Sequence, residues 1–284
     1  MRKDRKENTL DDVGTPEDSE EFLMRNLKIT LAYDGTEFSG WQVQPGLETI
    51  QGTLASAIGR LTGEKVLPQG SGRTDAGVHA LAQVASFATE SSIPVENWQK
   101  ALNDILPAAI RVLGVTEAAA EFHARKSAKE KTYRYRMYRG AVCPPFLARY
   151  VWHYPFPLDE GAMTEAADVV VGEHDFTSFA AVDTEKDKGI NHEGHEGTRR
   201  DSKIDNVRAI LSSTWAREGE EFIYAVRGSG FLHHMVRNLV GTFLLVGKGT
   251  LAVPDVARIL AARDRSAAGA TAPASGLYLV EVGY

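Results

Sequence analysis

The sequence predicts a mixed α and β protein built in two halves. Three observations predict this class: stretches that alternate apolar and polar residues, stretches with apolar residues at helical spacing, and the occurrence of both kinds in each half of the chain. The chain has 284 residues, of which 43% are hydrophobic and 25% are charged, as is typical of a folded protein with one large domain or two modest ones. The predicted fold class is therefore α/β or α+β.

The first half follows a charged segment. Residues 1–24 hold eight acidic and four basic side chains and few apolar ones, so we expect a disordered acidic tail. The alternation in residues 27–33 then predicts a strand. Residues 50–61 have apolar positions at helical spacing, and Gly63 follows as a stop. A strand, a helix and a strand are predicted next, over residues 81–88, 91–107 and 110–115.

The second half shows a similar order of elements, although no short sequence repeat relates it to the first. Tyrosine and arginine alternate in residues 133–138, which predicts a strand. Asp159 is a candidate cap for a helix that Gly172 ends, and residues 183–203 are predicted to form a polar loop. A strand pair at 207–214 and 222–227, helices at 232–247 and from Pro254, and a last strand at 277–282 complete the half. The predicted halves are residues 25–122 and 123–284.

The charge of the chain is unevenly distributed. The net charge of −6 argues at first against a nucleic-acid partner. Residues 123–139, however, carry seven basic side chains against the single acidic Glu130, a local charge of +6. An acidic whole chain is therefore compatible with a basic groove.

The cysteine content and the hydropathy indicate in which cellular compartment the protein works. A single cysteine, Cys143, excludes an internal disulfide framework and any zinc site with several cysteines. The charged N-terminal segment has no apolar core of a signal peptide, and uncharged stretches such as residues 266–280 are too short and too interrupted to span a membrane. We expect a cytoplasmic protein without membrane contact.

A glycine-rich segment is the first candidate for chemistry. Its sequence is Gly70-Ser-Gly-Arg-Thr-Asp-Ala-Gly-Val-His79. Arg73 and Asp75 are two residues apart, so both side chains can lie on one side of an extended loop. A carboxylate beside a guanidinium stays ionised, which suits a nucleophile or a charge stabiliser. The alternative is a tight turn with a local ion pair.

The basic stretch is the second candidate. In a strand, Arg134 and Arg136 would lie on one face and Tyr133 and Tyr135 on the other. Basic side chains bind phosphates, and aromatic rings stack on unpaired bases. The alternative is an amphipathic strand with a solvated basic face.

The third candidate is the start of the apolar helix at 232–247. Arg237 lies near its N-terminal end, where a charge needs a partner or a cleft. His233 and His234 are adjacent, so on a helix their side chains would diverge by about 100°. This argues against a metal site made by both and favours packing or phosphate contacts. The alternative for Arg237 is a structural ion pair.

Three other patterns are excluded by their spacing. The glycines at 70 and 72 lack the third glycine of a dinucleotide fingerprint. The histidines at 192 and 195 do not have the zincin spacing. Residues 241–249 have one residue too many for a Walker loop and lack its Ser or Thr.

Several motifs together resemble the tRNA pseudouridine synthase A family. The strongest is GRTDAGVH at residues 72–79, which looks like the active-site loop of that family. The resemblance covers residues 27 to 284, and the departures, in the tail and in the loop at 183–200, touch no motif. Four further motifs follow the family's order, at residues 33–42 (YDGTEFSGWQ), 122–135 (FHAR and KTYRY), 174–179 (HDFTSF) and 231–238 (FLHHMVRN).

The resemblance implies a fold, an activity and an assembly. The fold would join two similar α/β halves, with mixed and largely antiparallel sheets flanked by helices, around one active-site cleft. The activity would be isomerisation of uridine to pseudouridine in the anticodon arm of tRNA, usually at positions 38, 39 and 40. The family works as a homodimer and uses no cofactor, and no metal is expected.

The resemblance also implies roles for individual residues. Asp75 would be the catalytic nucleophile, and Tyr133 would contact the target base. Arg73 would hold the backbone of the flipped nucleotide, and Arg237 would pair with Asp75. The predicted RNA-binding residues of the basic stretch are Arg125, Lys131, Arg134 and Arg136.

Two other functions remain open on the residues alone. A non-catalytic RNA-binding protein is disfavoured because a carboxylate in the binding site does not help to bind anionic RNA. A hydrolase with an aspartate nucleophile would not need the Tyr/Arg strand. For the synthase, the carboxylate could attack the sugar, add to the base or assist proton removal from C2′, and the sequence does not choose among these paths.

Overall fold

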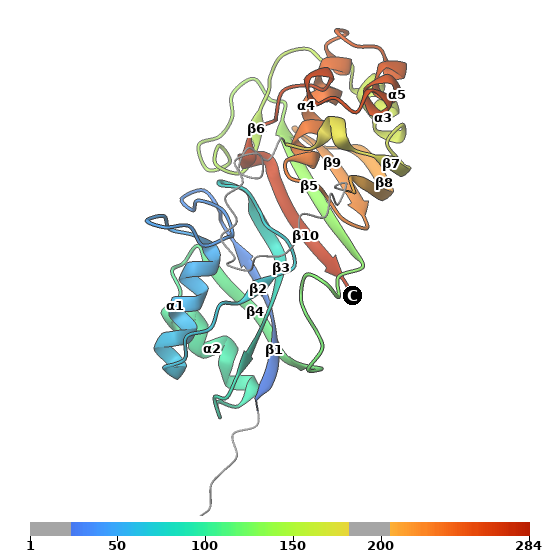
Figure 1. The fold of residues 1–284 in the computed structure, drawn as a ribbon. Helices are drawn as coiled ribbons and strands as arrows, with labels where there is room; N and C mark the ends of the chain where they lie inside the picture. The colour runs from blue at the N-terminus through green and yellow to red at the C-terminus, as the bar shows by residue number, and fades with distance from the viewer. Residues whose placement is uncertain (1–23, 182–204) are drawn as a thin grey trace, which may run out of the picture.

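A computed structural model describes residues 24–181 and 205–284 (Figure 1). The described strands form one ten-stranded mixed sheet, and five α-helices flank it. This arrangement confirms the predicted mixed α and β class. The predicted acidic tail, apart from Met24, and the predicted loop at 183–203 lie outside the described residues.

The first half contains the strands and helices that the hydropathy pattern predicts and one short strand, β2, that it does not. Helix α1 ends where Gly63 adopts a positive φ of 78°, a conformation that glycine accepts without strain. The catalytic-loop candidate lies between a short strand, β2, and the long strand β3. The elements are β1 (Arg25–Tyr33), α1 (Ile50–Thr62), β2 (Gln69–Gly70), β3 (His79–Thr89), α2 (Val95–Ile105) and β4 (Ile110–Ala118).

The second half also follows the prediction, with two additions and shifted boundaries. Helix α3 ends at Asp168, whereas Gly172, the predicted stop, begins a strand. Asp159 caps α3 by accepting a hydrogen bond from the backbone N–H of Ala162. Strands β6 and β7 were not predicted, and α4 begins at Met235 rather than at residue 232. The elements are β5 (Glu130–Tyr138), β6 (Trp152–His153), α3 (Glu160–Asp168), β7 (Gly172–Asp175), β8 (Val207–Glu218), β9 (Glu221–Gly228), α4 (Met235–Gly247), α5 (Val253–Ala262) and β10 (Leu277–Gly283).

The last strand, β10, lies in the middle of the sheet. The strand order is β4-β1-β3-β10-β5-β9-β8-β7, with β2 beside β3 and β6 beside β5. β10 is parallel to β3 and antiparallel to β5, so the end of the chain pairs with strands of both predicted halves (Figure 1). The sequence predicts separate sheets in the two halves, whereas the described strands form one sheet that extends through both.

The helices lie in two groups along the sheet. Helices α1 and α2 accompany the strands of the first half, and α3, α4 and α5 accompany those of the second (Figure 1). Each group buries large apolar side chains, such as Trp98 of α2 and Phe243 of α4. No described helix is both long and apolar enough to cross a membrane.

Candidate active site

Asp75 lies on a loop that buried hydrogen bonds hold against the sheet. The hydroxyl of Ser71 donates to the side-chain oxygen of Gln83 at 2.6 Å, and the Gln83 amide donates to the carbonyl of Gly72 at 3.0 Å. The hydroxyls of Tyr33 and Thr74 are 2.8 Å apart. These side chains are buried, and buried polar groups that are satisfied in this way fix a loop in one conformation. The loop therefore presents Asp75 from a rigid base.

The turn after β1 supports the same loop from the other side. The backbone N–H of Trp41 donates to the carbonyl of Thr74 at 3.0 Å. Gly40 has a φ of 86°, and a Cβ there would lie only 2.7 Å from the carbonyl oxygen of Thr74. A side chain at position 40 would thus push the loop away, which explains the glycine. The motif at 33–42 consequently acts by packing on the loop.

The loop ends at a buried histidine that contacts β10. The backbone N–H of Gly35 donates to Nδ1 of His79 at 3.2 Å, and the ring of His79 stacks on Tyr278 with 4.8 Å between ring centroids. Burial lowers the pKa of His79, although nearby Asp34 opposes this effect. His79 thus contacts both the turn after β1 and the central strand β10 from the end of the glycine-rich loop.

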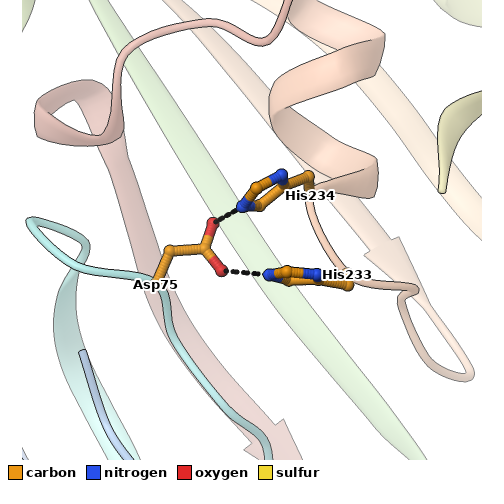
Figure 2. Close-up of side chains that lie close together, drawn as sticks. All are labelled: Asp75, His233 and His234. Atoms are coloured by element: carbon orange, nitrogen blue, oxygen red, sulfur yellow. Dashed lines mark ion pairs between the residues drawn. The ribbon is translucent and has the colours of Figure 1, made fainter. Parts of the chain in front are cut away.

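The carboxylate of Asp75 faces the beginning of α4 (Figure 2). Nη1 of Arg237 donates to Oδ2 of Asp75 at 2.7 Å. Nε2 of His234 lies 3.3 Å from Oδ2, and Nε2 of His233 lies 3.3 Å from Oδ1. The positive end of the α4 dipole adds to this environment, because Arg237 is the third residue of the helix. Residues 162 positions apart in the chain thereby meet at one carboxylate.

This environment keeps Asp75 ionised. Burial raises the pKa of the carboxyl, but His233, His234 and Arg237 together outweigh burial and hold the pKa below its usual range. Arg237 is itself fixed, since its Nε donates to the carbonyl of Ala272 at 2.7 Å. A partly buried carboxylate that stays charged is suited to act as a nucleophile.

The two histidines correct one sequence-based expectation. They do not diverge as on a helix, because α4 begins after them and His234 adopts a positive φ of 61°. Their rings lie 3.9 Å apart between centroids, on the same side of the chain. Together with Asp75 they bring three potential metal-ligand atoms within 4.8 Å of one another. The guanidinium of Arg237 contacts the same carboxylate, where its charge opposes the binding of a cation.

Tyr133 of β5 lies in the buried part of the same region. Its ring meets the ring of Phe231 edge to face, with 5.0 Å between centroids. Burial raises the pKa of Tyr133, and the charges of Tyr33 and Asp75 act in the same direction. The phenol therefore keeps its proton at working pH.

Comparison with known proteins identifies the family. A family model described as tRNA pseudouridine synthase matches residues 29–125 and 166–284. The chain belongs to the tRNA pseudouridine synthase family. Asp75 and the cluster at the start of α4 lie inside the matched segments, and Tyr133 lies between them.

Curated relatives in this family match nearly the whole chain. The tRNA pseudouridine synthase A of Solibacter usitatus (strain Ellin6076) is 52% identical over 261 residues, which cover 92% of this chain and 100% of the relative. The proteins of that name from Moorella thermoacetica and Brevibacillus brevis are 46% and 45% identical, each over at least 91% of this chain and 99% of the relative. These relatives span the motifs on which the resemblance rests.

Arg73, which family resemblance assigns to the flipped nucleotide, lies on the exposed side of the loop. Its guanidinium forms no ion pair with Asp75, so the local pair that the spacing allowed does not form. The guanidinium beside Asp75 belongs to Arg237, as family resemblance implies. An exposed Arg73 is consistent with a contact to the substrate.

Lys131 extends from the start of β5 to the loop of this synthase-family fold. Its Nζ donates to the carbonyl of Ser71 at 2.6 Å. Burial, with a smaller contribution from the charge of Arg125, lowers the pKa of Lys131 to about 8. Arg125 itself is exposed. The structure therefore places a lysine with a labile charge beside the segment that carries Asp75.

The two arginines of the basic strand differ in their surroundings. Tyr133 and Tyr135 are buried, so the predicted alternation of faces is present. Arg136 donates from Nε and Nη2 to the carboxylate of Glu221 at 2.7 and 2.5 Å, and lies over the ring of Tyr278. Arg134 is exposed, and within residues 24–181 and 205–284 it has no ion-pair partner. Only Arg134 presents an uncompensated charge.

The sequence favours packing or phosphate contacts for His233 and His234 and does not place either ring at Asp75, where both lie in the structure. The signal was present, because both belong to the motif at 231–238 that carries Arg237. What the pattern did not reveal is the start of α4, which decides where the two rings point.

Proposed function

We propose that this protein isomerises uridine to pseudouridine in the anticodon arm of tRNA, at positions 38, 39 or 40, with Asp75 as the nucleophile. The observation that supports this most strongly is the ionised carboxylate of Asp75 on a rigid glycine-rich loop, paired with Arg237. Membership of the tRNA pseudouridine synthase family supports the substrate class.

The reaction exchanges one bond for another. The N1–C1′ bond of uridine breaks, the base turns, a C5–C1′ bond forms, and the proton on C5 is replaced by a proton on N1, so the mass does not change. An ionised carboxylate can attack the sugar carbon, add to the base, or assist proton removal from C2′. Each path requires Asp75 to be charged before the substrate arrives, as its environment ensures.

Tyr133 and Arg237 have separate roles in this proposal. Tyr133 contacts the target base, and its hydroxyl is the agent or relay in removal of the C5 proton: it passes on its own proton as it accepts the one from C5. Arg237 holds the carboxylate. The base must first leave the helical stack, at a cost of a few kcal/mol. Arg73, on the exposed side of the loop, would hold the backbone of the flipped nucleotide.

The exposure and ion pairing of the basic side chains indicate which of them contact RNA. Arg125 and Arg134 are exposed, and Lys131 lies beside the catalytic loop. We assign these three to phosphate contacts, while Arg136, which is paired with Glu221, contributes through the structure of the strand.

Assembly and cofactors complete the proposal. We propose a homodimer, with twice the chain mass of 31.0 kDa, which light scattering on the purified protein would test. No metal or cofactor takes part, so exhaustive chelation should leave the rate unchanged, and a loss restored by one metal would contradict this. A single cysteine is in keeping with a cytoplasmic location.

The deciding experiment is the substitution Asp75→Asn. The change is nearly isosteric, so the loop should fold, and tRNA affinity should stay equal or rise because a negative charge near phosphates is lost. Pseudouridine-specific labelling of tRNA should detect no product. Asp104→Asn is the matched control, since Asp104 is an exposed helix residue that pairs with the exposed Lys100.

Two outcomes would overturn the proposal. Substantial conversion by a normally folded Asp75→Asn variant would remove the nucleophile. Tight tRNA binding by the parent protein without any product, on tRNA that contains unmodified uridine at positions 38 to 40, would favour a non-catalytic RNA-binding protein.

A further inference from the structure

The contacts of Asp75 are unequal at its two oxygens. Oδ2 contacts His234 at 3.3 Å and Oδ1 contacts His233 at 3.3 Å (Figure 2). Oδ2 also contacts Arg237 at 2.7 Å. The side chains of Arg237 and His234 are 15% and 29% exposed, and that of His233 is 61% exposed. One oxygen therefore faces the protein, and the other faces the more open side.

The backbone at His234 explains how its ring reaches the carboxylate. His234 has a φ of 61°, a left-handed conformation that few residues other than glycine adopt and that histidine, asparagine and aspartate tolerate best. It is the N-cap of α4, yet its side chain makes no capping hydrogen bond. A strained backbone at a helix start, with the side chain directed at a catalytic carboxylate in place of the helix, points to a functional constraint.

We propose that His234 is a positioning residue that fixes Oδ2 of Asp75 together with Arg237, and that Oδ1 is the oxygen that acts on the substrate. The inference rests on the proposed role of Asp75 as nucleophile. It applies equally to attack on the sugar, addition to the base and proton removal from C2′. Each of these needs one carboxylate oxygen held in place by the protein and the other directed at the substrate.

The position of the neighbouring charges supports this division. The groups that act on His234 are Asp75 from the loop, His233 beside it, Arg237 on α4 and Arg265 in the segment after α5. Burial lowers the pKa of His234, and the two arginines and His233 lower it further against the effect of Asp75. A neutral imidazole holds the carboxylate without neutralising it, so the reactivity of Oδ1 is preserved.

His233 has a different part in this arrangement. It is the more exposed ring and contacts the oxygen that we assign to the substrate. A nucleotide that approaches Oδ1 must therefore displace His233 or pass beside it. Loss of His233 should affect turnover less than loss of His234.

The test compares His234→Asn, His233→Asn and the control His153→Asn in single-turnover and steady-state assays on tRNA. Asparagine tolerates the left-handed backbone, so His234→Asn should melt like the parent, but its shorter side chain cannot reach Asp75. We expect kcat to fall about tenfold or more for His234→Asn, with KM and tRNA affinity within about twofold. His153 contacts the carbonyl of Gly140 and should be silent.

The pH profile separates positioning from a structural role. His234 contributes to the low pKa of Asp75, so without it the acid limb of the kcat profile should shift to higher pH. A merely structural role would lower the amount of active enzyme and leave the limb in place. As a second variant, His234→Gly accepts the same backbone, and added imidazole should restore part of its turnover.

The outcomes distinguish this inference from the proposed function. If Asp75→Asn stays active in the same assays, the proposed nucleophile is wrong. If Asp75→Asn is inactive but His234→Asn keeps full kcat and an unshifted acid limb, the positioning role is wrong. A loss in His233→Asn as large as in His234→Asn would overturn the assignment of Oδ1.

Discussion

Tyr133 combines a stacking surface with a hydroxyl that keeps its proton, and the two can be separated. Tyr133→Phe preserves the ring and its edge-to-face contact with Phe231. We expect tRNA affinity near that of the parent and a kcat lower by about a hundredfold, because positioned proton transfer contributes about 10²–10⁴ to rates. Rapid-quench assays with radiolabelled tRNA would measure both.

Tyr138→Phe is the control for this change, since Tyr138 ends the same strand at its pairing with Glu221. Its turnover should equal that of the parent. If Tyr133→Phe is equally fast, the hydroxyl has no part in proton transfer, and the side chain acts by contact alone.

We expect Lys131 to make tRNA binding dependent on pH. Its pKa of about 8 is below the ordinary value for lysine, so the free protein loses this positive charge as the pH rises through about 8. Phosphate binding requires the charged form, and affinity should therefore weaken between pH 7 and 9. In Lys131→Gln, affinity should be lower at pH 7 and should lack this step.

Lys129→Gln is the matched control, because Lys129 is an exposed lysine of the same stretch. It should lower affinity by a similar factor at every pH in this range. An equal pH step in parent and Lys131→Gln would show that another group titrates.

At the level of single residues, the sequence predicted the carboxylate but not all of its partners. Asp75 is recognisable because glycine, arginine and threonine surround it in a motif. Arg237 was expected to pair with it only through family resemblance. The histidines were missed because the direction of a side chain at a helix start depends on one backbone angle, which hydropathy does not encode.

At the scale of elements, the structure distinguishes two arginines of strand β5 that the sequence alone does not. Arg134 and Arg136 look alike in the Tyr/Arg alternation. In the part of the chain that the structure describes, Arg136 forms an ion pair with Glu221 and Arg134 forms none. Arg134→Gln should flatten the dependence of log affinity on log salt by about 0.7–0.9 for one lost phosphate contact. Arg136→Gln should leave the slope unchanged and lower the melting temperature.

Filter binding of tRNA at several salt concentrations would measure these slopes, with melting curves on the same samples. A flatter slope for Arg136→Gln than for Arg134→Gln would show that Arg136 leaves Glu221 when RNA binds. The ion pair would then be a feature of the free protein only.

Most helices and strands could be predicted, because local signals specify them. Gly63 ends α1 and Asp159 caps α3 at the expected positions. The start of α4 was placed three residues too early, since Leu232 fits the apolar spacing although the helix begins at Met235. The strands that were not predicted, β2, β6 and β7, have only two, two and four residues, too few for a period to be detected.

At the scale of the whole molecule, β10 decides how the halves are joined. The alternation at 277–282 predicted a strand but not its neighbours, because strand pairing depends on contacts far apart in sequence. Leu279 is fully buried and pairs with Ala80 on β3 and with Tyr133 on β5. The predicted boundary at residue 122 therefore separates segments of the chain that share a strand.

This topology predicts that the two halves unfold together. Leu279→Ala should destabilise the protein by about 2–5 kcal/mol, as large-to-small changes in a core do. Because β10 pairs with both β3 and β5, hydrogen exchange should accelerate in both strands by comparable factors, and the melt should stay a single transition.

Ile58→Ala is the control: Ile58 is also fully buried, but it lies on α1 within the first half. If unfolding is global, an equal loss of unfolding free energy in Ile58→Ala should also accelerate amide exchange in β3 and β5 by comparable factors. Faster exchange in β3 alone after Ile58→Ala, or in β5 alone after Leu279→Ala, would show that the halves open independently and that β10 does not couple them.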